Sequence, residues 1–283
     1  MFVIESAGLT DVGKKRKGNE DALVVDDELG LYIVADGMGG HRAGEVASKL
    51  VIESMRDYLK RFHVNGEDVE ELEDADSSLS KEANRIESGI RLSNSVVFQI
   101  ANREEAYQGM GSTVSVIYFN ERTLVAANVG DSPIFLIHKD KIELLSEPHT
   151  VVAEQAAIDP EGARQLGGEF RHMLTRAIGT EERVRANVCE IPYFKDDILV
   201  ICSDGLTDLV ESNEILDVVR IHPPEQACRS LIDLANQRGG TDNITVVVLK
   251  VKKSNTHNGK MKRLISKVTE GFSNITSKRK DNG

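Results

Sequence analysis

The sequence predicts an α+β protein in which antiparallel strands and long helices occupy separate layers. Two observations lead to this class. Short apolar stretches follow one another across connections of only a few residues, and long segments with apolar residues at helical spacing are inserted among them. Because parallel neighbours need a crossover of a dozen or more residues, strands joined by such short connections are expected to be antiparallel. A doubly wound parallel sheet is therefore disfavoured.

Six apolar stretches are predicted to be strands. They are residues 31–34, 113–119, 123–128, 134–138, 198–201 and 244–251. Three of them, 113–119, 123–128 and 134–138, follow one another closely, and the connections at 120–122 and 139–141 are too short for a crossover. We therefore expect antiparallel neighbours in this part of the chain.

Three segments are predicted to be helices because their apolar residues recur at three- and four-residue steps. They are residues 43–62, 80–104 and 224–238. In the first of them Val46, Leu50 and Met55 share one face, which is typical of a helix that covers a sheet.

Composition restricts both fold and function. The chain has 283 residues, 40% of them apolar, which is enough for one large core or two small ones. Its net charge of −11 disfavours nucleic acid as the main ligand. No stretch approaches the roughly 18–20 apolar residues of a membrane span, and the first residues lack a signal-peptide pattern. Three widely spaced cysteines, Cys189, Cys202 and Cys228, indicate reduced thiols, so we expect a cytoplasmic protein.

Charge divides the chain after Val251. Residues 252–283 hold nine basic and two acidic residues, whereas residues 1–251 carry a net charge of −18. We predict a folded domain over 1–251 and a basic tail over 252–283. Apolar residues of the tail fall at helical spacing, which is typical of an amphipathic helix that docks on a membrane surface or a partner. A disordered tail, or one that contacts the acidic body, is the alternative.

Acidic residues stand at the ends of the predicted strands. They are Asp36, Asp131, Asp204 and Asp242, to which Glu20 and Asp21 add two more carboxylates. One such aspartate is an ordinary turn residue, but so many favour a shared site. Converging carboxylates without Cys or His among them favour a hard divalent cation, Mg²⁺ or Mn²⁺. Their mutual repulsion predicts two ions, which together can activate a water for attack on phosphorus.

Two other phosphate chemistries are disfavoured by spacing. A cysteine phosphatase needs an arginine six residues after its cysteine, and those positions hold Lys195, Asp208 and Leu234. The segment that begins at Gly8 is one residue from a P-loop, but Lys15 stands where Ser or Thr would hold magnesium.

Seven motifs occur in the order typical of one family. They are Arg16-x-x-Asn19-Glu20-Asp21, Val34-Ala35-Asp36-Gly37-Met38-Gly39-Gly40-His41, Gly44-Glu45-x-Ala47-Ser48, Gly109-Met110-Gly111-Ser112-Thr113, Asn128-Val129-Gly130-Asp131-Ser132, Cys202-Ser203-Asp204-Gly205-Leu206-Thr207-Asp208 and Gly239-Gly240-Thr241-Asp242-Asn243-Ile244-Thr245. They resemble the motifs of the metal-dependent protein phosphatases of the PP2C (PPM) family, bacterial members in particular. The resemblance covers about residues 6–251. It implies a four-layer α-β-β-α sandwich of two mainly antiparallel sheets.

The resemblance implies two core metal sites. Asp36 would bridge both ions. Asp204 and Asp242 would complete the first site, and Glu20 with the carbonyl of Gly37 would serve the second.

The resemblance also implies roles around these ions. Asp21 would orient the attacking water, and Arg16 would bind the substrate phosphate through its planar fork of donors. Asp131 and Asp208 would form, with Asp204, the weaker third metal site of many members.

The implied reaction is hydrolysis of phosphoserine or phosphothreonine in proteins by a metal-activated water, with Mn²⁺ or Mg²⁺ as cofactor and no phosphoenzyme. Expected partners are phosphorylated proteins and a cognate Ser/Thr kinase that the enzyme would oppose, or a phosphorylated regulator that it would reset. We expect a monomer. Two alternatives stay open: a catalytically weak module that binds phosphoproteins, and a two-metal phosphodiesterase or nuclease.

Residues about 146–180 would correspond to the family's mobile flap beside the site. Pro133 and the sequence Glu147-Pro148-His149-Thr150 depart from the family's usual residues, so we expect flap contacts and substrate preference to differ while activity is kept. The seven histidines show no ligand spacing. We expect His41 to pack at a helix start, and His149 and His172 to lie at the surface or in the flap.

Overall fold

The computed structural model describes residues 2–39, 43–65 and 75–255. The predictions for His41, and for the tail after residue 255, concern residues outside these ranges. None of the helices within them is both long and apolar enough to cross a membrane.

Two antiparallel sheets form the centre of the molecule. The first has the strand order β1-β11-β10-β7-β8, and the second has the order β2-β3-β5-β6-β9, with the short strand β4 beside β3. The first sheet consists of β1 (Val3–Asp11), β7 (Ile134–His138), β8 (Lys141–Leu144), β10 (Ile198–Cys202) and β11 (Ile244–Lys253). The second consists of β2 (Asp21–Asp26), β3 (Leu31–Met38), β4 (Gly111–Ser112), β5 (Val114–Phe119), β6 (Thr123–Val129) and β9 (Asn187–Pro192).

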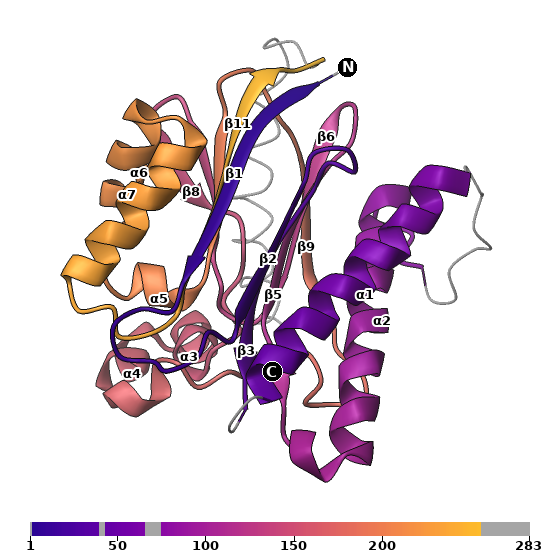
Figure 1. The fold of residues 1–283 in the computed structure, drawn as a ribbon, viewed down its shortest axis with the longest axis vertical. Coiled ribbons are helices and arrows are strands. Elements are labelled where there is room, and N and C mark those ends of the chain that lie inside the picture. Colours follow the sequence, from indigo (N-terminus) through magenta and orange to yellow (C-terminus); the bar gives the residue numbers. More distant parts are fainter. Residues whose placement is uncertain (1, 40–42, 66–74, 256–283) are drawn as a thin grey trace.

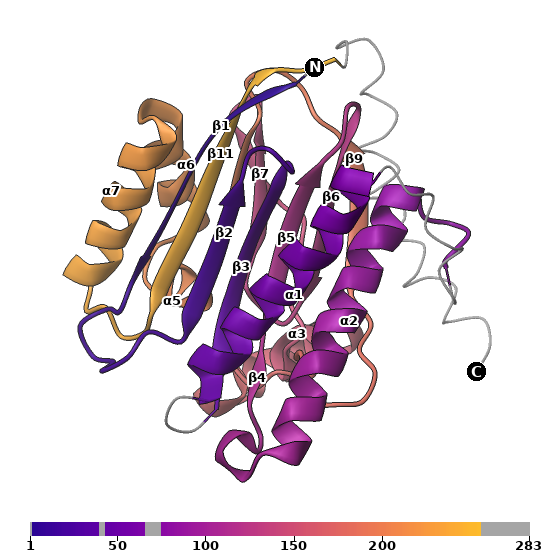
Figure 2. The ribbon, with the colours of Figure 1, turned by 45° about the vertical axis from the view of Figure 1, so that its right-hand side comes forward.

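Helices cover the outer face of each sheet. The second sheet is covered by α1 (Ala43–Asn65) and α2 (Lys81–Arg103), and the first by α5 (Asp204–Thr207), α6 (Ser212–Ile221) and α7 (Pro224–Gln237). Figure 1 shows the two sheets face to face with a helical layer on either side, and Figure 2 shows α1 and α2 lying across the second sheet. Two short helices, α3 (Val151–Ile158) and α4 (Pro160–Gln165), lie at one end of the sandwich, in the connection from β8 to β9. Single 3-10 turns stand at Glu105–Tyr107 and Gly168–Phe170.

Three apolar clusters bind these four layers together. Strand β3 contributes to two of these clusters, because its side chains alternate between its two faces. Leu31, Ile33 and Ala35 belong to the cluster shared with α1 and α2, whereas Tyr32 and Val34 belong to the cluster between the two sheets. A further cluster joins the first sheet to α6 and α7. The four-layer sandwich expected from the family resemblance is thus confirmed.

One predicted pairing is wrong. Residues 123–128 and 134–138 were expected to be antiparallel neighbours, but they lie in β6 and β7, which belong to different sheets. Strand β6 pairs with β5 and β9, and β7 pairs with β10 and β8. Residues 130–133 therefore carry the chain across the sandwich instead of closing a hairpin. Asp131 lies in this crossing, between the end of β6 and the start of β7.

Candidate active site

The layer between the two sheets becomes polar at one end. Side chains alternate along each strand, so Asp36 follows Tyr32 and Val34 on the face of β3 that meets the other sheet. Asp21 precedes Leu23 and Val25 on the same face of β2, and residue 245 of β11 precedes Val247 in the same way. Apolar side chains therefore fill most of this layer, and polar ones replace them where the strands end.

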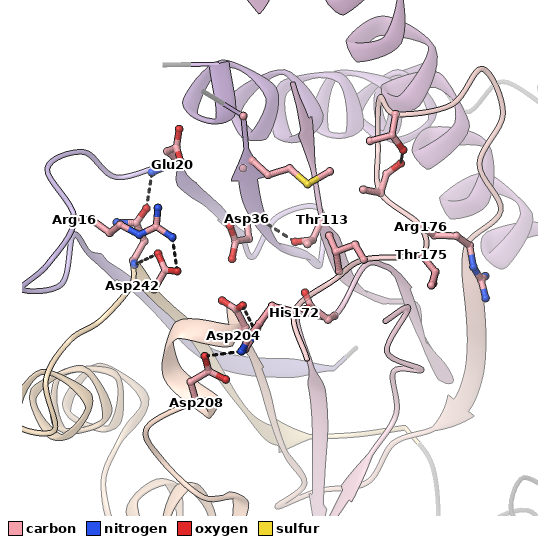
Figure 3. A pocket seen from close by; sticks show the side chains of 18 of the residues that line it. Arg16, Glu20, Asp36, Thr113, His172, Thr175, Arg176, Asp204, Asp208 and Asp242 are labelled. Atoms are coloured by element: carbon pink, nitrogen blue, oxygen red, sulfur yellow. Dashed lines mark hydrogen bonds and ion pairs between the residues drawn. The ribbon is translucent and has the colours of Figure 1, made fainter. Parts of the chain in front are cut away.

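A cavity of about 760 Å³ opens at this polar end (Figure 3). It brings together most of the residues proposed from the sequence, namely Arg16, Glu20, Asp36, Gly37, Asp131, Asp204, Asp208 and Asp242. These residues come from five separate parts of the chain, and the structure places the strand-end acids around one cavity. Asp21 is the predicted residue that does not line the cavity.

Asp36 and Asp21 lie side by side as register partners of β3 and β2. Burial raises the pKa of Asp36 well above its usual value, and the carboxylates of Asp21, Asp204 and Asp242 raise it further. Asp21 is only 7% exposed, and one of its oxygens accepts hydrogen bonds from Ser203 (2.8 Å) and Thr245 (2.6 Å).

The other oxygen of Asp21, Oδ1, is buried and has no hydrogen-bond partner among the described residues. Burial raises the pKa of Asp21 to about 6, against the opposing effect of the two hydroxyl groups. The carboxylates at this end of the layer thus hinder one another's ionisation.

Asp204 begins the short helix α5, which follows β10, and Asp208 caps its C-terminal end. The helix packs tightly on the loop before β11, since a Cβ on Gly205 would lie 2.0 Å from the carbonyl oxygen of Asn243. Only glycine fits there, and this close approach brings Asp204 near Asp242. Burial and the charge of Asp204 raise the pKa of Asp208.

Asp131 is held at the crossing between the sheets. Gly130 before it has φ of +100°, a conformation that other residues rarely adopt, and a Cβ there would clash with Thr113. Thr113 also shares a hydrogen bond of 2.8 Å with Ser132. Burial and the neighbouring Asp204 raise the pKa of Asp131 to about 7.

Glu20 approaches the site from the side of α1. A Cβ on Gly44 would lie 2.7 Å from Glu20 Oε1, and a Cβ on Gly37 would lie 2.0 Å from the carbonyl oxygen of Gly44. The two glycines therefore allow β3, the start of α1 and Glu20 to meet. Burial raises the pKa of Glu20.

Arg16 forms an ion pair with Asp242, with 2.7 Å between Nη2 and Oδ2. The Arg16 side chain is 51% exposed and lines the cavity, so it can reach a group that enters from solvent. The predicted phosphate-binding arginine and a predicted metal ligand are thus partners in this structure (Figure 3).

Six residues of the flap segment (146–180) also line the cavity, and the motifs indicated neither of the two that can carry positive charge, His172 and Arg176. His172 lies with Nδ1 3.4 Å from Asp204 Oδ2 and Nε2 3.6 Å from Asp208 Oδ2. Arg176 lies at the right of Figure 3, away from these two acids. Ligand atoms of Asp131, His172 and Asp204 all lie within 4.8 Å of one another. The expectation that no histidine joins the acids is therefore not met. Neither residue stands at a strand end, so the pattern that located the acids could not find them.

His149 belongs to the flap segment, as expected, but it is fully buried and does not lie at the surface. Its Nδ1 accepts a hydrogen bond of 3.1 Å from the Gly130 N–H, and its Nε2 lies 3.2 Å from Asn187 Oδ1. Burial lowers the pKa of His149, in keeping with a neutral ring that bears its proton on Nε2. The unusual sequence at 147–150 thus ties the flap segment to the loop that carries Asp131.

The three thiols offer no competing nucleophile. Cys189, Cys202 and Cys228 are free, and burial raises the pKa of each, to about 11 for Cys189 and about 12 for Cys228. Thiols that stay protonated at neutral pH are poor nucleophiles. This agrees with the spacing that disfavoured cysteine phosphatase chemistry.

The donor set fits hard divalent cations. Seven acidic residues line the cavity, and Oδ1 of Asp21, which is also buried, has no hydrogen-bond partner within the described part of the chain. Among the described residues, these cavity-lining carboxylates form ion pairs with Arg16 and His172. Mn²⁺ and Mg²⁺ take such ligands and would relieve the repulsion that raises these pKa values.

Comparisons with known proteins agree with this site. The family model described as "Protein phosphatase 2C" matches residues 8–244. The chain is 33% identical over 247 residues to the serine/threonine phosphatase stp of Listeria welshimeri, which covers 85% of this chain and 93% of that protein.

Solved structures share the fold. The serine/threonine phosphatase Stp1 of Staphylococcus aureus is 30% identical with a TM-score of 0.74, covering 89% of this chain and 96% of that chain. The catalytic domain of the phosphatase PstP in complex with two manganese ions is 30% identical with a TM-score of 0.74, covering 89% of this chain and all of that domain. The chain described here therefore belongs to the PP2C family of metal-dependent protein serine/threonine phosphatases.

Proposed function

We propose that the cavity binds a phosphoserine or phosphothreonine side chain of a protein and hydrolyses it with two Mn²⁺ or Mg²⁺ ions. The observation that carries this proposal is the convergence of Asp36, Asp204 and Asp242 on one cavity from separate strand ends. The two manganese ions in the PstP catalytic domain support the number of ions.

Each acid receives a place in this scheme. Asp36 lies centrally and would be shared by both ions, with Asp204 and Asp242 on one side. Glu20 and the carbonyl of Gly37 would serve the other ion, on the side of the site where both residues pack against Gly44 of α1. When bound, the ions supply positive charge that activates water and neutralises phosphoryl oxygens.

Asp21 acts through its neighbours. Its carboxylate is fixed by Ser203 and Thr245, and it lies beside Asp36 without lining the cavity. We therefore place it as a positioning residue, which keeps Asp36 oriented and, through Asp36, helps to orient the attacking water.

Arg16 would bind the phosphate. Its guanidinium lies half exposed at the rim and already bonds one oxygen of Asp242, which leaves further donors of its planar fork for a phosphate oxygen. A contact of this kind stabilises bound substrate more than it activates water, so it acts mainly on KM.

The physiological setting is part of the proposal. Substrates would be phosphoproteins made by a Ser/Thr kinase, and the free, unpaired cysteines support a reducing compartment such as the cytoplasm. The net charge of −11 argues against nucleic acid as a substrate.

Hydrolysis of para-nitrophenyl phosphate, phosphoserine and phosphothreonine peptides, and bis-para-nitrophenyl phosphate tests the proposal. Monoester hydrolysis should require Mn²⁺ or Mg²⁺ and disappear with a chelator. Phosphopeptide binding without turnover would instead indicate a binding module, and a preference for the bis-ester would indicate a phosphodiesterase. Asp217→Asn, on the exposed face of α6, is the matched control for the acids of the site, and it should retain full activity.

A further inference from the structure

The flap segment is attached firmly at its base and weakly beyond it. At the base, His149 N–H bonds the carbonyl of Gly130, and Thr175 N–H bonds the carbonyl of His149. Beyond the base, α3 has no buried residue and α4 buries only Ala163. The position of residues 151–171 relative to the cavity therefore depends on few contacts with the rest of the domain.

His172, directly after this stretch, contacts Asp204 and Asp208 of the catalytic site. Its two ring nitrogens face different carboxylates, at 3.4 Å from Asp204 and 3.6 Å from Asp208. These separations are longer than a normal N–H to carboxylate hydrogen bond. The ring thus stands close to both acids without a direct hydrogen bond to either.

Two ligands of one cation can be no farther apart than the sum of two metal–ligand bonds. With bonds of about 2.0–2.3 Å, that limit is about 4.0–4.6 Å. Atoms of Asp131, His172 and Asp204 lie within 4.8 Å of one another, so one ion can contact all three without large movements. Figure 3 shows the His172 side chain beside Asp204 and Asp208.

We propose that His172 is a ligand of the cation held by Asp131, Asp204 and Asp208, so that occupancy of this site fastens the flap segment to the catalytic domain. This inference rests on the proposed function, because it assumes that the cavity holds divalent cations. It adds a ligand from the flap segment to a cluster that otherwise comes from the two sheets and α5.

Two consequences follow. Coupling is reciprocal, so ion binding favours the docked flap segment, and a docked flap segment raises affinity for the ion. In addition, an imidazole ligand favours Mn²⁺ or Zn²⁺ over Mg²⁺, which prefers oxygen ligands and water. The site should therefore prefer Mn²⁺ more strongly than an all-carboxylate site would.

Manganese titration of the full chain tests the proposal. Metal-free wild type, His172→Ala and the neighbouring control Met173→Ala would be titrated with Mn²⁺ while free Mn²⁺ is followed by EPR, with and without excess Mg²⁺. Affinity of the weakest site should fall at least about tenfold in His172→Ala and stay unchanged in the control. Hydrogen exchange gives a second readout, because Mn²⁺ should slow exchange in residues 151–171 of wild type and control but not of His172→Ala.

If His172→Ala bound Mn²⁺ and exchanged hydrogen as the wild type does, the inference would be overturned. The ring would then be only a neighbour of the two acids. Because that result would appear together with Mn²⁺-dependent hydrolysis, the proposed function would stand. Absence of both Mn²⁺ binding and hydrolysis in the wild type would overturn the proposed function and this inference together.

Discussion

The two ends of strand β2 carry the same residue in opposite electrostatic settings. Asp21 and Asp26 are 7% and 8% exposed. Asp26 accepts hydrogen bonds from the Leu29 N–H at 3.1 Å and from Arg56 at 2.9 Å, and together these outweigh burial and lower its pKa. Asp21 has two hydroxyl donors, an oxygen without a partner and other carboxylates around it, and its pKa is raised to about 6.

Asp26 is therefore a structural acid, whereas we infer that Asp21 and its neighbours are functional ones. Asp26 is stabilised by groups of the chain, whereas the acids around Asp21 and Asp36 are incompletely balanced by the described cations. Proteins hold such strained arrangements where chemistry requires them, and here the described residues do not supply the balancing charge. The predictions below test this difference between the two ends, beginning with the largest expected effect.

Asp36→Asn should abolish catalysis while the fold persists. The substitution removes the carboxylate nearest to all the others, so bound ions lose their shared ligand and several kcal/mol of transition-state stabilisation. We expect kcat for para-nitrophenyl phosphate to fall about 100-fold or more. Activity above a tenth of the wild-type value would contradict the site, and Asp217→Asn serves as the control.

Asp26→Asn should show the reverse pattern. The neutral amide weakens the bond with Arg56 and leaves a partly buried guanidinium without its anion, so unfolding free energy should fall by about 1–2 kcal/mol. Urea titration measures this loss, and metal-saturated kcat should stay near the wild-type value. If Asp26→Asn lowered kcat as strongly as Asp36→Asn, the two ends of the molecule would not differ in the proposed way.

Arg16→Ala tests the exposed cation of the site end. Because Arg16 is 51% exposed, its ion pair with Asp242 contributes little to stability, and loss of the phosphate contact should dominate. We expect KM for a phosphothreonine peptide to rise about tenfold with a smaller change in kcat. A large fall in kcat with unchanged KM would assign Arg16 to the chemical step instead.

Strand-end aspartates could be predicted from sequence because apolar runs and their boundaries are visible along the chain. The assignment of neighbouring strands to different sheets could not, since four residues can either close a hairpin or cross the sandwich, as they do between β6 and β7. Sequence patterns could not identify His172 as a residue of the site either. Its contact with Asp204 and Asp208 arises from how the flap segment folds back, and no periodic signal marks it.

The smallest effect concerns stability and pH in the metal-free protein. An acid whose pKa is higher in the folded than in the unfolded state binds more protons when folded, so its contribution to stability falls as pH rises. For Asp21 this loss should develop between its unfolded pKa, about 3.9, and about 6. Asp21→Asn keeps an oxygen that can accept from Ser203 and Thr245, so it should reduce the loss while preserving the fold.

Urea midpoints at pH 4.5 and 7 in chelator measure this difference. Wild type should lose more stability than Asp21→Asn over the interval, and added Mn²⁺ should narrow the gap, because a bound cation favours the ionised acids that raised pH produces. Asp26→Asn supplies the contrast. Since the pKa of Asp26 is lowered, its contribution is fully present above its unfolded pKa of about 3.9 and disappears only as pH falls below that value, so this variant should keep the wild-type change in stability between pH 4.5 and 7. Equal pH dependence in all three proteins would show that the two ends of β2 are electrostatically alike.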